Sequence, residues 1–124
     1  MTESTTITQE EIDACKPIHA AWNELAKMWT FPIIHALGLG APARFNELKR
    51  RTEGISATSL AERLSYLERS GVVGRKVYPE TPPRVDYSLT KKGWELHEIL
   101  QSMEDWVKRW EVKDLVLEST SSSR

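Results

Sequence analysis

The chain has 124 residues and a formal net charge of −1, and 40% of its residues are hydrophobic and 28% are charged. This length suits one domain, and the composition is that of a globular protein, which argues against wholesale disorder. No apolar run approaches the roughly 20 residues that a membrane-spanning helix needs, and the acidic start MTESTTITQEEIDAC is unlike a secretory signal peptide, so we expect a cytoplasmic protein.

The first third of the chain predicts two helices. After residues 1–12, which we expect to be a flexible lead-in, apolar residues recur at helical spacing from Pro17 onward. These residues are Ile18, Trp22, Leu25 and Trp29. Thr30 is suited to cap a second helix, TFPIIHAL, which Gly38 and Gly40 are expected to end.

Two short helices follow, with a glycine-containing turn between them. The segment RFNELKRRT predicts the first helix, with Phe45 and Leu48 facing inward and three basic residues facing outward. The basic residues are Lys49, Arg50 and Arg51. Ser56 is a good N-cap for the second helix, which runs to Gly71. Its apolar stripe consists of Leu60, Leu64 and Leu67. Such a pair is typical of a helix-turn-helix.

The chain then changes from helical to strand periodicity. VVGRKVY and RVDYSLT are rich in β-branched and aromatic residues, and Val85, Tyr87 and Leu89 alternate with polar residues. The prolines between the two runs belong in a loop or at a strand edge. A hairpin directly after a helix-turn-helix is a wing, and the prolines would stiffen it beside the second helix. Thr90 is expected to cap a long final helix that ends near Asp114.

Together these elements predict a mainly α fold with a small β-hairpin wing, a winged helix-turn-helix domain over residues 13–115. A disordered tail is expected over residues 116–124. Between Ala43 and Lys92 the chain has eleven Lys and Arg against six Asp and Glu, a balance of +5, whereas the remainder has −6. A basic middle between acidic flanks indicates a nucleic-acid-binding surface, although an uneven, merely solvated surface is the alternative.

The same segments carry motifs of a known family. Residues 44–48 read RFNEL, residues 54–56 read GIS, and residues 60–93 read LAERLSYLERSGVVGRKVYPETPPRVDYSLTKKG. These motifs resemble those of the HxlR-type winged helix-turn-helix transcriptional regulators, which are relatives of the MarR group. The resemblance covers roughly Pro17–Trp110 and implies a dimeric, DNA-binding regulator of nearby genes. Many family members carry a lysine where this chain has Thr58.

The predicted contacts with duplex DNA come first from the second short helix, over residues 56–70, in the major groove. The candidates are Ser56, Thr58, Ser59, Glu62 and Arg63. Hydroxyl groups bond base edges or phosphates, glutamate accepts from a cytosine amino group, and arginine reaches guanine or phosphate. The alternative is that Ser56 is only a cap and that Glu62 and Arg63 are merely solvated. For Arg63, which lies near the edge of the apolar stripe, it also stays open whether the side chain braces the core or binds phosphate.

The wing, over residues 72–90, is predicted to touch the DNA backbone or the minor groove. Its candidates are Arg75, Lys76 and Arg84, and the first helix of the motif adds Lys49 and Arg50. Arg44 and Asn46, at the start of that helix, are weaker candidates. Basic side chains on an edge hairpin also discourage strand aggregation, which is the alternative explanation for them.

The tryptophans predict assembly into a homodimer. Trp94, Trp106 and Trp110 lie on a predicted helix of about 25 residues, roughly 37 Å long, and a domain of this size cannot cover all three. With Trp22, we expect the N- and C-terminal helices to form a two-fold interface. Such a dimer would set two recognition helices about one DNA turn, roughly 34 Å, apart. A tryptophan stripe in a monomer core is the alternative.

Cys15 is a possible redox residue, because Lys16 beside it could stabilise a thiolate, although a lone cysteine is often inert. His19, His35 and His97 have no metal-like spacing, and we find no catalytic motif, so we expect no enzyme activity, cofactor or metal. A winged-helix protein-interaction module without DNA binding is the alternative function. The sequence leaves any small-molecule effector unknown.

Overall fold

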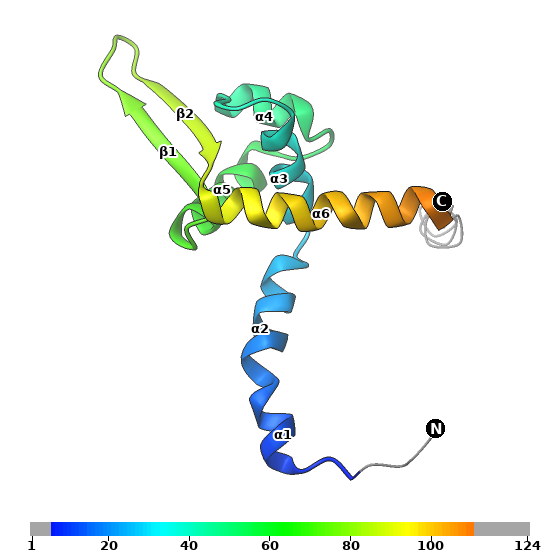
Figure 1. Ribbon diagram of the computed structural model, residues 1–124. Coiled ribbons are helices and arrows are strands. Elements are labelled where there is room, and N and C mark those ends of the chain that lie inside the picture. Colours follow the sequence, from blue (N-terminus) through cyan, green and yellow to red (C-terminus); the bar gives the residue numbers. More distant parts are fainter. Residues whose placement is uncertain (1–5, 111–124) are drawn as a thin grey trace.

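The computed structural model describes residues 6–110, which form six helices and one β-hairpin (Figure 1). The elements are α1 (Gln9–Ala14), α2 (Lys16–Leu25), α3 (Thr30–Leu39), α4 (Phe45–Arg51), α5 (Ala57–Arg69), β1 (Val73–Tyr78), β2 (Arg84–Leu89) and α6 (Lys91–Trp110). The predicted mainly α fold with a hairpin is therefore confirmed. The predicted helix end near Asp114 and the tail over residues 116–124 lie outside the described residues. No helix within residues 6–110 is long and apolar enough to cross a membrane.

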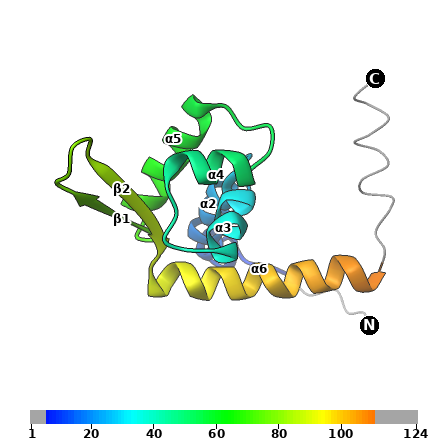
Figure 2. The same cartoon turned by 90° about the horizontal axis from the view of Figure 1, so that it is seen from above.

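The core lies between α3, α5, the base of the hairpin and α6, which runs along one side of the body (Figure 2). The predicted leucine stripe of α5 is confirmed, because Leu60, Leu64 and Leu67 are all buried. The largest side chains buried around them are Ile33, Ile34, Leu37, Leu48 and Val73. Burial of each such side chain contributes about 1.5–3 kcal/mol, so the stripe fixes which face of α5 stays in solvent.

A short backbone pairing joins the hairpin to the start of α4. The N–H of Ala43 donates to the carbonyl oxygen of Tyr87 at 2.9 Å, and the N–H of Tyr87 donates back at 2.8 Å. Within the hairpin the strands are antiparallel, with Val77 opposite Val85. Because Ala43 is buried and lies two residues before α4 begins, this pairing fixes the wing against the helix-turn-helix.

Thr90 caps α6, as predicted. Its Oγ1 accepts a hydrogen bond from the N–H of Gly93 at 3.1 Å and donates toward the carbonyl oxygens of Gly71 and Val72. A Cβ atom at Gly93 would collide with that carbonyl oxygen of Val72, so glycine lets α6 approach the base of the hairpin closely. The hairpin and α6 are thus joined by a tight, hydrogen-bonded corner.

Three local predictions need correction. Thr30 is the first residue of α3 and is fully buried, so its side chain serves packing and not the helix cap. Gly38 lies inside α3 and does not end it; a Cβ there would collide with His97 of α6, so the glycine permits close helix contact. Helix α1 begins inside the predicted lead-in over residues 1–12 and continues to Ala14, because Thr8 and Glu11 make a capping box around its first turn.

Helices α1 and α2 form an N-terminal arm, residues 9–25, that runs away from the rest of the molecule in Figure 1. Neither helix contains a buried residue. The predicted apolar series holds on α2 for Ile18, Trp22 and Leu25, of which Ile18 and Trp22 are exposed. Trp29 lies outside α2, because the helix ends at Leu25 and Trp29 has a left-handed backbone, with a φ of 78°. Most of the arm's apolar surface therefore has no partner within the described part of a single chain.

Arg51 was predicted to face solvent, and this prediction is wrong. Its side chain is half-buried, and Nη1 donates to the carbonyl oxygens of Ala36 at 3.0 Å and Gly40 at 2.7 Å. The last carbonyl groups of a helix lack partners within that helix, and a basic side chain can satisfy them. Arg51 thus caps the C-terminal end of α3 and is a structural residue.

Replacing Arg51 with alanine should lower the free energy of unfolding by about 1–3 kcal/mol, because buried carbonyl groups lose a charged donor. Arg50→Ala, on the exposed side of the same helix, is the matched control and should change stability by less than about 0.5 kcal/mol. Urea unfolding followed by circular dichroism measures both. Equal losses in the two variants would contradict the capping role.

Candidate nucleic-acid interface

The turn between α4 and α5 sets the angle between the two helices of the motif. Gly54 has a φ of 95°, a backbone conformation that favours glycine, and Thr52 and Ile55 on either side are buried. Ser56 then caps α5, because its Oγ accepts a hydrogen bond from the N–H of Ser59 at 3.1 Å. The predicted cap is confirmed, and any contact that Ser56 makes with DNA is additional to it.

The polar face of α5 is open to solvent near its N-terminus. Thr58 and Glu62 are exposed, and Ser59 is half-buried. Within residues 6–110 no hydrogen bond or ion pair engages the side chains of Thr58 or Glu62. These two side chains are therefore available to an external partner, on the face opposite the leucine stripe.

Arg63 has partners inside the protein. It is half-buried, its Nη1 donates to Oγ1 of Thr30 at 3.2 Å, and its guanidinium lies 4.7 Å from the centre of the Tyr66 ring. These contacts favour the alternative in which Arg63 stabilises the core and does not contact DNA. They also explain why Thr30 can be fully buried, since its hydroxyl oxygen accepts a hydrogen bond.

The basic side chains of the wing fall into two groups. Arg75 is exposed and has no ion-pair or hydrogen-bond partner within residues 6–110, and Lys76 is exposed with its Nζ 5.0 Å from the Tyr78 ring centre. Arg84 is half-buried: its guanidinium stacks 3.8 Å from the same ring, and its Nη1 lies 3.4 Å from Oε2 of Glu80. The wing thus offers two free cations and one that is held in place.

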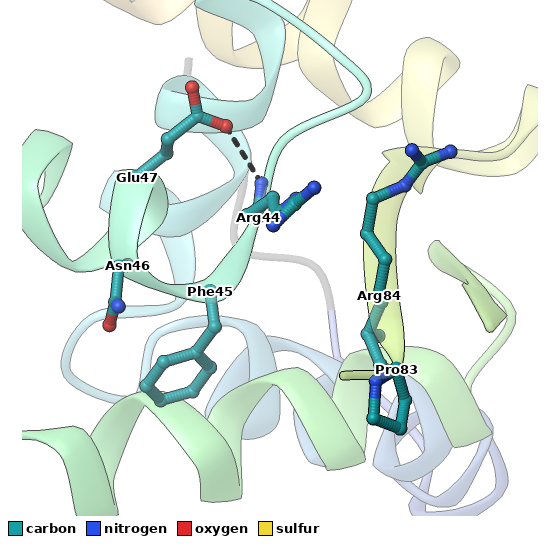
Figure 3. Close-up of a pocket in the computed structure, with 7 residues that line it drawn as sticks. Arg44, Phe45, Asn46, Glu47, Pro83 and Arg84 are labelled. Carbon is teal, nitrogen blue, oxygen red and sulfur yellow. Dashed lines mark hydrogen bonds between the residues drawn. The ribbon is translucent and has the colours of Figure 1, made fainter. Parts of the chain in front are cut away.

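A groove of about 630 Å³ opens between the start of α4 and the wing (Figure 3). Its lining residues are Arg44, Phe45, Asn46, Glu47, Pro83, Arg84 and Val85. Asp86 lies beside the groove, with its Oδ1 4.0 Å from Nε of Arg44 and 3.7 Å from Nε of Arg84. From the sequence, Arg44 and Asn46 were only weak candidates and Asp86 was not a candidate, because the proximity of α4 and β2 follows from tertiary pairing.

Glu47 adds a fixed negative charge near the groove. Its Oε1 accepts a hydrogen bond from the backbone N–H of Arg44 at 2.9 Å, which lowers the pKa of the carboxyl below its ordinary value. The charges of Arg51, Arg50 and Arg44 lower that pKa further. Glu47 is therefore ionised at neutral pH and bound to the helix start, and it leaves the Arg44 side chain free to extend across the groove (Figure 3).

The remaining candidates lie on α4, on the N-terminal arm and on α6. Lys49 and Arg50 are exposed on α4. Cys15 is exposed at the junction of α1 and α2, and Lys16 beside it pairs with Asp13 at 3.1 Å. Within residues 6–110 no three His, Cys, Asp or Glu side chains are grouped as metal ligands. The tryptophans predicted to form an interface are all exposed: Trp22, Trp94, Trp106 and Trp110.

Comparison with known proteins agrees with this architecture. The model of the HxlR-like helix-turn-helix family matches residues 24–114. The transcriptional regulator YodB of Bacillus subtilis is 41% identical over 96 residues, which cover 77% of this chain and 85% of YodB. YvaP of the same organism, an uncharacterised regulator of the helix-turn-helix type, is 40% identical over 98 residues, 79% of this chain and 90% of YvaP.

Solved structures give the same result. The reduced form of YodB from B. subtilis matches with a TM-score of 0.66 and 42% identity, covering 77% of this chain and 92% of that one. The redox regulator HypR in its reduced form matches with a TM-score of 0.71 and 33% identity, covering 84% of this chain and 99% of that one. With the hairpin beside α5, these matches show a winged helix-turn-helix. The chain belongs to the HxlR-like helix-turn-helix family, a family of transcriptional regulators and not of enzymes.

Proposed function

We propose that this transcriptional regulator acts in the cytoplasm as a homodimer that binds duplex DNA sequence-specifically, by occupying an operator. The observation that carries the proposal is the free polar face at the start of α5, where Thr58 and Glu62 are exposed and have no partner within residues 6–110. Exposed cations on the adjacent wing provide the complementary attraction to phosphate. Neither feature contributes to the packing of the core.

The two parts of the surface have different roles in binding. Helix α5 enters the major groove, where Thr58 and Glu62 contact base edges, as can the hydroxyls of Ser56 and Ser59. Arg75 and Lys76 on the wing, with Lys49 and Arg50 on α4, contact the phosphate backbone. Base contacts specify the sequence, whereas phosphate contacts set orientation and add salt-dependent affinity.

The proposal is tested by fluorescence anisotropy on pooled intergenic duplexes, titrated with salt. Arg75→Gln should reduce the slope of log K against log salt by about 0.9, the value of one phosphate contact, on every duplex. Glu62→Ala should cost about 1–3 kcal/mol on the operator and little on other sequences. Lys27→Gln, an exposed side chain between α2 and α3 that is not among the predicted DNA contacts, is the control and should change neither quantity.

Weak binding that none of these variants alters would contradict DNA recognition. It would favour the alternative that the fold is a protein-interaction module. The polar side chains of α5 would then be a solvated surface, and the wing would serve another purpose.

Dimer formation is supported by the unpartnered apolar surface. Helices α1 and α2 bury no residue, and on α6 the side chains of Trp94, Trp106 and Trp110 are exposed. Large apolar side chains in such number on neighbouring helices mark an interface in a soluble protein. A two-fold arrangement through α6 and the N-terminal arm would present two α5 helices to successive turns of the major groove.

Replacing Trp106 with glutamate should convert the dimer into a monomer, because two charges would be buried without partners at the two-fold interface. Sedimentation velocity measures the change. Val77→Glu is the matched control, since Val77 is similarly exposed but lies on the wing, and it should leave the dimer intact. A wild-type protein that sediments as a monomer at micromolar concentration would contradict the proposal.

A redox response through Cys15 is a second candidate. The thiol is exposed, and proteins similar to this chain include a redox regulator, HypR, and YodB in a diamide-treated form. Diamide would take two electrons and two protons from the Cys15 thiols of two chains and join them by a disulfide. Diamide should then weaken DNA binding in the wild type but not in Cys15→Ser. An equal response in both proteins would contradict the role of Cys15.

A further inference from the structure

Two arginines from different elements share one carboxylate beside the groove between α4 and the wing. Asp86 is the most buried of the three residues: its side chain is 15% exposed, whereas that of Arg84 is 30% and that of Arg44 is 58% exposed. The Nε atoms of both arginines lie within 4.0 Å of the same oxygen, Oδ1 of Asp86. These three residues carry a net charge of +1, which the pairing of Glu80 with Arg84 offsets, and they join the wing to the start of α4.

The backbone explains why the three residues meet. Asp86 directly precedes Tyr87 on β2, and Arg44 directly follows Ala43, and those two neighbours are joined by a pair of backbone hydrogen bonds. Arg84 lies two residues before Asp86 on the same face of β2, where the Tyr78 ring supports its guanidinium. The position of the cluster is therefore fixed by buried backbone contacts.

The cluster has unused capacity to bind an anion. At 4.0 Å the Arg44–Asp86 pair is too long for a direct hydrogen bond, and the Arg44 side chain is 58% exposed. Nε of Arg84 is buried and lies 3.7 Å from Asp86, so a phosphate would reach the other nitrogens of this side chain, which is 30% exposed. Figure 3 shows the Arg44 side chain extending from the residue before α4 toward the strand that carries Arg84. Two guanidinium groups at one edge of an open groove are suited to hold one phosphate, which they bind with planar, paired donors.

We propose that Asp86 is a positioning residue that holds Arg44 and Arg84 at the groove between α4 and the wing, so that the pair binds one phosphate of the DNA backbone. The inference rests on the proposed function, and it adds a clamp formed jointly by the helix-turn-helix and the wing. Without the carboxylate, the two cations repel each other and Arg44 turns into solvent. Asp86 lowers the cost of ordering these long side chains when DNA binds.

Two explanations of Asp86, charge repulsion of DNA and positioning of the two arginines, predict opposite effects of removing its charge. Asp86→Asn removes a negative charge near polyanionic DNA, so on charge alone it should tighten binding. If Asp86 positions the clamp, the Kd should instead rise, by about tenfold, and the salt slope should fall by about 0.9 for the lost phosphate contact. Asp86→Glu keeps the carboxylate and should bind like the wild type. Fluorescence anisotropy on the operator measures all three proteins.

A matched control comes from the other carboxylate that pairs with Arg84. Glu80→Gln also removes a negative charge from the wing, but Glu80 does not contact Arg44, so this variant should bind at least as tightly as the wild type. Arg44→Gln changes an exposed side chain and should lower the salt slope as much as Asp86→Asn does. The double variant Asp86→Asn/Arg44→Gln should be no weaker than either single variant, because both act on one contact.

The outcomes separate this inference from the proposed function. A wild-type protein without salt-dependent DNA binding would overturn both. Wild-type binding with an Asp86→Asn variant that binds as tightly or more tightly would overturn the clamp alone. Thermal unfolding checks that Asp86→Asn is folded; if it is not, an unchanged salt slope in Arg44→Gln overturns the clamp by itself.

Discussion

The backbone pairing between Ala43 and Tyr87 is the constraint on which the arrangement of the candidate DNA-binding surface depends. It consists of only two hydrogen bonds, of 2.9 and 2.8 Å, but it connects the segment before α4 to the middle of β2. Breaking such a pair in a buried position costs about 1–3 kcal/mol for each group left unsatisfied. The wing therefore does not move independently of α4, and the groove between them, with its two arginines, has a defined width.

Much of the fold could be predicted because its signals are local. The leucine stripe of α5, the Ser56 and Thr90 caps and the change to strand periodicity each involve residues within a few positions of one another. Gly38 shows the limit of such signals. A glycine after an apolar helix is a normal stop signal, but here it lies against His97 of α6, a contact 59 positions away in the sequence that no local pattern contains.

The sequence predicted which types of side chain the candidate site contains, but not what each side chain does in the structure. Arg50 and Arg51 are adjacent and chemically identical, yet one faces solvent and the other caps α3, because only the second lies within reach of the carbonyl groups of Ala36 and Gly40. In the same way Arg75 is free, whereas Arg84 stacks on Tyr78. The sequence identifies the cations that a DNA-binding surface needs. The packing decides which of them are committed to the protein itself.

In the proposed dimer, the hydrogen-bonded corner at Thr90 couples the packing of the two α6 helices to the position of the DNA-binding elements. Helix α6 begins directly after β2, its cap residue is bonded to the turn before β1, and Gly93 brings its first turn against Val72. The first turn of α6 therefore cannot rotate without moving the base of the wing. A change in how two α6 helices pack would shift wing and α5 together as one body, because the core contacts and the Ala43–Tyr87 pairing hold them. An effector or an oxidant then needs to favour only one packing of the dimer to change the spacing of the two recognition helices.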